Sequence, residues 1–92
     1  MATIEQIAKC KEIFELAMLV TSQGGEVIHA EYIAHIDAFN VYKAGQIEGW
    51  DCNARVTYLG KESIARHAKA RLEDIKSELN AMLKRDADGV PV

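Results

Sequence analysis

The chain has 92 residues, of which 49% are hydrophobic, and a formal net charge of −3. This length predicts one domain, and so small a net charge does not select nucleic acid, membrane or any other class of partner. The longest apolar run, residues 16–20, is far too short to cross a membrane, so we expect no membrane partner. Two cysteines are too few for a disulfide framework, and charged residues stand where a signal peptide needs an apolar run. We therefore expect a cytoplasmic protein.

The two signs of charge are sorted along the chain. Residues 26–52 hold one basic and five acidic side chains, a balance of −4, whereas residues 53–71 hold five basic and one acidic, a balance of +4. Such sorting is typical of a protein that presents charged surfaces to a partner. We call Glu31, Asp37, Glu48 and Asp51 the acidic patch, and Arg55, Lys61, Arg66, Lys69, Arg71 and Lys76 the basic patch.

The N-terminal segment has the features of a capped amphipathic helix. Thr3 and Gln6 are spaced as a capping box, in which each side chain bonds the backbone amide of the other. A helix over residues 4–21 follows, and Gly24 with Gly25 predicts its end. The expected buried stripe consists of Ile7, Cys10, Phe14, Ala17 and Met18.

The middle of the chain alternates apolar and polar residues. This pattern predicts a strand over residues 26–39, although Ile28, Tyr32, Ile36 and Phe39 also fit one face of a helix. After a turn at Asn40, we expect strands at 41–49 and 54–59. The solvent face of the first strand would display His29, Glu31, His35 and Asp37.

The C-terminal segment 59–85 predicts one long helix. Its apolar residues form a stripe at helical spacing: Ile64, Ala68, Leu72, Ile75, Leu79 and Met82. The expected fold is thus a two-layer α+β domain over residues 1–85, with helix, three-stranded antiparallel sheet and helix, both helices on one face. Residues 86–92 are expected to form a flexible tail.

Few residue patterns suggest chemistry. His29, Glu31 and His35 share a strand face on which a metal or an acid–base pair could form, but zinc sites usually need three or four ligands and the two cysteines have no pairing spacing. We expect solvated side chains there, and hence no enzyme, no metal, no cofactor and no small-molecule substrate. The aromatic residues Tyr42 and Trp50 could fill the core or serve as interface anchors.

The basic patch has two interpretations. Its side chains along the C-terminal helix suit contacts with backbone phosphates. Glu62 precedes Arg66 by four residues and Glu73 follows Lys69 by four, so the same side chains could instead form solvated ion pairs. Both interpretations stay open from the sequence.

One resemblance follows from the element order and the start of the second helix. The expected order of helix, three strands and helix resembles the double-stranded RNA-binding domain. Ala68-Lys69 matches the Ala-Lys pair at the start of that family's second helix. The resemblance implies recognition of an RNA duplex by shape and phosphate contacts.

A second resemblance concerns the whole chain and the stretch 58–67, which reads Tyr-Leu-Gly-Lys-Glu-Ser-Ile-Ala-Arg-His. The chain resembles the small phage-encoded anti-CRISPR proteins that inhibit the type I-F surveillance complex. This implies stoichiometric binding to Cas proteins, and to their guide RNA, in the cytoplasm of the host bacterium, so that target DNA is blocked. The acidic patch would meet a lysine- and arginine-lined channel, and the basic patch the guide RNA.

Overall fold

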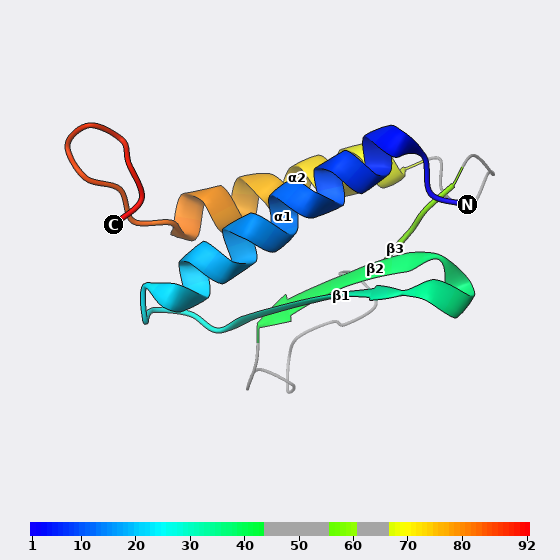
Figure 1. Cartoon of the computed structure of the whole chain (residues 1–92), viewed down its shortest axis with the longest axis horizontal. Helices are drawn as coiled ribbons and strands as arrows, with labels where there is room; N and C mark the ends of the chain where they lie inside the picture. The colour runs from blue at the N-terminus through cyan, green and yellow to red at the C-terminus, as the bar shows by residue number, and fades with distance from the viewer. Residues whose placement is uncertain (44–55, 61–66) are drawn as a thin grey trace.

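The computed structural model describes residues 1–43, 56–60 and 67–92. In these ranges both helices lie on one face of an antiparallel sheet with strand order β1-β2-β3, which confirms the expected α+β fold (Figure 1). Helix α1 packs on β1 and α2, and α2 packs on β3. The elements are α1 (Ile4–Ser22), β1 (Ile28–Ile33), the 3-10 turn η1 (Ala34–Ile36), β2 (Ala38–Lys43), β3 (Val56–Tyr58) and α2 (Ala68–Met82).

Helix α1 begins with the predicted capping box. The Thr3 hydroxyl accepts from the Gln6 amide at 3.1 Å, and the Gln6 side chain accepts from the Thr3 amide at 2.9 Å. The helix ends at Ser22, and Gly24 takes the positive φ, +80°, that follows many helix ends. No helix in the described ranges is long and apolar enough to cross a membrane.

The buried stripe of α1 differs from the predicted one. Ile7 is 49% exposed and Met18 69% exposed, while Ile13, outside the predicted stripe, is fully buried. The helix carries apolar residues on more than one face, so the contacts with β1 and α2, and not the helix alone, decide which face is buried. The residues buried along α1 are Cys10, Ile13, Ala17 and Val20.

The prediction of one strand over residues 26–39 is wrong, because the chain reverses direction between Ile33 and Ala38. The turn η1 is followed by Asp37 in the left-handed region at φ 49°, whose amide donates to the Ala34 carbonyl at 3.2 Å. Aspartate tolerates that region better than most residues. Asn40, the expected turn residue, lies inside β2 opposite Glu31.

The reversal also changes which residues face the helices. In the register of the hairpin, Tyr32 pairs with Phe39 and Ala30 with Val41, so odd-numbered residues of β2 share a face with even-numbered residues of β1. Phe39 is fully buried, and its ring meets Phe14 of α1 edge to face with centroids 5.1 Å apart.

Helix α2 covers Ala68–Met82, whereas the predicted helix covers residues 59–85. Leu59 is not helical: its amide donates to the Asp37 carbonyl at 2.9 Å, which ties the end of β3 to the hairpin turn. The helix stops at Met82 because Leu83 adopts an extended conformation. Residues 44–55 and 61–66, which include most of the expected second strand and Ile64, lie outside the described residues. Of the described residues of the predicted stripe, Ala68, Leu72, Ile75 and Leu79 are buried and Met82 is half-buried.

The last residues fold back toward the end of α1. The Gln23 side chain donates to the carbonyls of Lys84 and Val92, at 2.8 and 2.9 Å, and accepts from the Lys84 amide at 2.8 Å. Asp86 closes the loop by accepting from the Val90 amide at 3.0 Å. Flexibility of residues 86–92 stays a prediction.

Candidate interaction surfaces

Part of the basic patch lies at the start of α2. Lys69 is exposed in the first helical turn, and Arg71 beside it is half-buried. Lys69 borders a hollow of about 310 Å³ between the first turns of the two helices. We call this region the helix-start surface; its lining residues are Thr3, Glu5, Gln6, Lys9, Lys69, Leu72 and Glu73. Arg55, Lys61 and Arg66 lie outside the described residues.

Farther along α2 the positive charge is neutralised by ion pairs between the helices. The Lys76 ammonium lies 2.9 Å from the Glu12 carboxylate, and the Lys9 ammonium lies 2.5 Å from Glu73 and 3.5 Å from Glu12. The hydrogen bond from Lys76 lowers the pKa of Glu12, and the bond from Lys9 lowers the pKa of Glu73. The interpretation of solvated ion pairs therefore fits Lys76, whereas Lys69 lies exposed beside the hollow.

The acidic patch does not form one surface among the described residues. Asp37 accepts a hydrogen bond from the Tyr32 hydroxyl at 2.6 Å and lies 3.3 Å from the Met1 amine, on the helix side of the sheet. The bond from Tyr32 lowers the pKa of Asp37 and raises the pKa of Tyr32 itself. Glu31 lies on the opposite face, and Glu48 and Asp51 lie outside the described residues.

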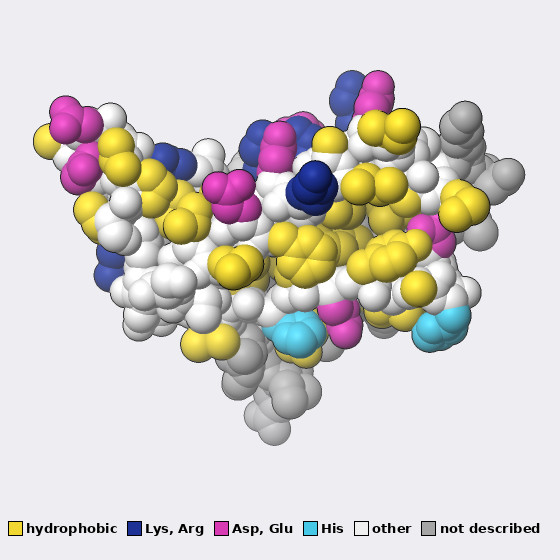
Figure 2. All heavy atoms as spheres, in the orientation of Figure 1, with side chains coloured by type: hydrophobic (Ala, Val, Ile, Leu, Met, Phe, Trp, Pro, Cys, Tyr) yellow, Lys and Arg dark blue, Asp and Glu magenta, His cyan; other side chains and the backbone are white. Residues whose placement is uncertain are grey.

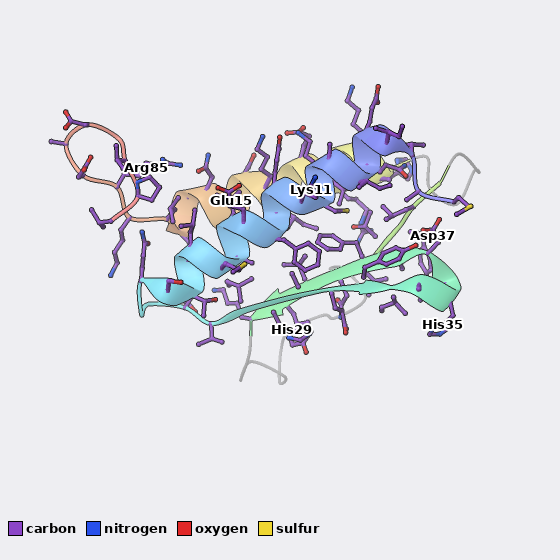
Figure 3. The ribbon with its side chains drawn as sticks, in the orientation of Figure 1. Lys11, Glu15, His29, His35, Asp37 and Arg85 are labelled. Atoms are coloured by element: carbon purple, nitrogen blue, oxygen red, sulfur yellow. The ribbon has the colours of Figure 1, made fainter. Side chains whose placement is uncertain are left out.

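The predicted row of polar side chains on the open face of the sheet is only partly present. His29 Nε2 lies 3.7 Å from the Glu31 carboxylate, and the His29 ring packs on Tyr42 with centroids 4.6 Å apart. His35 lies in η1 at the other end of the hairpin (Figure 3). Tyr42 is thus a half-buried ring beside a histidine, and Trp50 lies outside the described residues. In the described part of the chain, no three His, Cys, Asp or Glu side chains are grouped to hold a metal.

An apolar surface lies on the flank of α1, and it includes Ile7, Phe14 and Met18 of the stripe that was predicted to be buried. Figure 2 shows hydrophobic side chains gathered where α1 lies over β1. We call this surface the apolar flank and define it by Ile7, Phe14, Met18 and Tyr32, three of which are 49–69% exposed. Apolar side chains that are exposed together on one face can mark an interaction site. Helix α1 has more apolar residues than one buried face requires, and residues 16–20 are apolar on every side.

A hollow of about 270 Å³ opens in this flank between α1 and the hairpin. Ile7, Phe14 and Tyr32 line it together with Lys11 and the Cys10 thiol. Burial raises the pKa of Cys10 to about 11, so its thiol stays protonated at neutral pH and is a poor nucleophile. The hollow is therefore suited to apolar contact, with one cation at its rim, and not to thiol chemistry.

Compared with known protein families, curated proteins and solved structures, the chain matches none.

Proposed function

We propose that this protein is a non-enzymatic binding protein that inhibits a type I CRISPR surveillance complex in the host cytoplasm. It would bind Cas proteins and guide RNA stoichiometrically and so block target DNA. The resemblance of the whole chain and of the stretch 58–67 supports the choice of partner.

The exposed position of Lys69 is the observation that carries the proposal. Lys69 stands in the first turn of α2 beside an open hollow, and the sequence places Lys61 and Arg66 just before it. A cation at this position can contact backbone phosphates of the guide RNA, whereas Lys76 already bonds Glu12. The helix-start surface is therefore the proposed contact with the surveillance complex.

The test measures binding of target DNA by a purified type I-F complex as the protein is titrated. We expect DNA binding to fall to zero near equimolar protein, and Lys69→Glu to require a large excess for the same effect. Lys84→Glu is the matched control, because Lys84 is also exposed but follows the opposite end of α2, which runs from Ala68 to Met82. Unchanged DNA binding at micromolar excess of the wild-type protein would overturn the proposal.

A second candidate function is recognition of double-stranded RNA, and the exposed position of Lys69 is the observation that favours it. Ala68-Lys69 falls on the Ala-Lys of that family, and in this fold Ala68 is buried while Lys69 is exposed. Under this proposal Lys69→Ala weakens binding to an RNA duplex and flattens its salt dependence. Absence of any duplex affinity at low salt would remove this candidate.

A further inference from the structure

The exposed side of α1 carries side chains at the spacing by which two helices pack along their length. They lie three, four, three and four residues apart, which is the seven-residue repeat of paired helices. Ile4 is 86% exposed, Ile7 49% and Met18 69%, so a neighbouring helix can contact them without disturbing the core of this chain. We call this row the exposed stripe; its members are Ile4, Ile7, Lys11, Phe14 and Met18.

The exposed stripe contains one charged residue, Lys11, and Glu15 follows it one helical turn later. Both side chains are exposed, and both lie on the front of α1 in Figure 3. Within residues 1–43, 56–60 and 67–92, neither side chain forms an ion pair or a hydrogen bond. A helix that covers the stripe therefore has to bring an anion to Lys11 and a cation to Glu15.

A second copy of α1 that runs in the opposite direction meets this requirement. When Ile7 lies opposite Met18 of the second copy, Lys11 lies opposite its Phe14 and one residue from its Glu15. Twofold symmetry makes each of these contacts twice. Each Lys11 ammonium can then pair with a carboxylate and lie against an aromatic ring, both of which attract a cation.

Other pairings of the same stripe leave Lys11 without an anion. Two parallel copies place Lys11 opposite Lys11, since equal positions then meet. Shifting the antiparallel copy by one seven-residue repeat places Lys11 opposite Ile7 or Thr21, and no acidic residue lies one position away from either. Charge thus selects the register in which Ile7 and Met18 meet.

The hollow in the apolar flank is complementary to the same second copy. Ile7 and Lys11 line this hollow of about 270 Å³. In the selected register Met18 and Phe14 of the second copy lie opposite these two residues, so their side chains reach the hollow. Methionine is flexible enough to fill such an irregular gap. The molecule measures 42 × 32 × 19 Å, and Figure 2 views it down the shortest axis, so the flank lies on a broad face that a second copy can approach.

We propose that the apolar flank is the interface of a symmetric homodimer, in which two α1 helices pack antiparallel with Ile7 of each copy opposite Met18 of the other. The second copy is the partner because the flank itself supplies the anion, the cation and the protruding side chain that its own covering requires. Lys69 belongs to the helix-start surface, which uses other side chains of α1. The dimer therefore goes beyond the proposed function, and each can fail without the other.

The first test is sedimentation equilibrium of the full chain over a concentration series. We expect a reversible monomer–dimer equilibrium for the wild type and a monomer for Met18→Glu, whose circular dichroism should match the wild type because Met18 is exposed. Val27→Glu is the matched control: Val27 is 57% exposed but lies outside α1, so this variant should dimerise like the wild type. A monomeric wild type in the upper micromolar range, a folded Met18→Glu variant that still dimerises, or equal weakening by Val27→Glu would overturn the proposal.

A charge exchange tests the register. Lys11→Glu and Glu15→Lys each place like charges at both symmetric contacts, so each variant alone should dimerise at least about tenfold more weakly than the wild type. In an equimolar mixture of the two variants, both of these contacts again join a cation to an anion. We expect the mixture to form heterodimers more tightly than either variant forms homodimers, which native mass spectrometry measures. A mixture that associates no better than the single variants contradicts the antiparallel register, as does unchanged dimerisation of either variant.

Discussion

The Gln6 side chain and the Gly60 backbone hold each other by two hydrogen bonds, 54 residues apart in sequence. Gln6 Oε1 accepts from the Gly60 amide at 2.8 Å, and Gln6 Nε2 donates to the Gly60 carbonyl at 3.0 Å. The same Oε1 accepts from the Thr3 amide, so one amide side chain both caps α1 and fixes the segment that leaves β3. The start of α1 and the end of the sheet are thereby joined.

We expect Gln6→Ala to destabilise the fold by about 2 kcal/mol, since it leaves partly buried backbone groups without partners. Gln6→Glu keeps the acceptor oxygens but loses the donor to the Gly60 carbonyl, so its loss should be smaller. Urea unfolding gives both free energies. Glu5→Ala, one position away and exposed, is the control and should change the free energy of unfolding by less than about 0.5 kcal/mol. Equal stability of Gln6→Ala and wild type would show that the hydrogen bonds between Gln6 and Gly60 do not stabilise the fold.

Gly60 itself meets two constraints that a side chain would violate. Its φ is +110°, and a Cβ atom would lie 3.3 Å from the Met1 carbonyl oxygen. Gly60→Ala should therefore destabilise the fold by at least about 1 kcal/mol. Gly25→Ala is the matched control, because an added Cβ has no neighbour within 4 Å there and φ is ordinary. The difference in melting temperature between the two variants measures the effect, and equal melting temperatures would contradict it.

The burial of Ile13 in place of the predicted Ile7 and Met18 can be tested by truncation. Ile13 is 0% exposed, so Ile13→Ala should cost about 2–5 kcal/mol of unfolding free energy. Met18→Ala, at 69% exposure, should stay within about 0.5 kcal/mol when measured at low protein concentration. A larger loss at Met18 than at Ile13 would mean that α1 buries the face the sequence pattern had indicated.

The sequence predicted the structure best where the residue pattern fits one local structure only. The capping box located the start of α1, and the stripe of α2 contains the residues that are buried. The hairpin turn was missed because residues 34–37 contain no glycine or proline, and only Asp37 carries a turn preference. Alternation continues beyond the turn, so the pattern looked like one strand.

The surfaces were harder to predict than the elements. Lys76 and Lys69 look alike in the sequence, and only the packing of α1 against α2 brings Glu12 to Lys76. The apolar flank arises because α1 has more apolar residues than its contacts can cover, and which ones remain outside depends on tertiary packing.

The contact between Tyr32 and Asp37 gives the hairpin turn a pH-dependent stability. The Tyr32 hydroxyl holds the pKa of Asp37 below its ordinary value of 3.8. A carboxyl whose pKa is lowered on folding stabilises the fold above its unfolded pKa, and this contribution is lost as pH falls through the folded value. Tyr32→Phe should raise the pKa of Asp37 toward 3.8 and move the acid loss of stability to higher pH.

An NMR titration of the carboxyl carbon measures that pKa directly, and acid unfolding measures its effect on stability. Tyr58→Phe is the matched control, because Tyr58 is similarly exposed, at 46% against 49% for Tyr32, and lies on a different strand. Its substitution should leave the titration of Asp37 unchanged, since the bond at 2.6 Å comes from the Tyr32 hydroxyl alone among the described side chains. An Asp37 pKa that is the same in Tyr32→Phe as in the wild type would show that another group stabilises its charge.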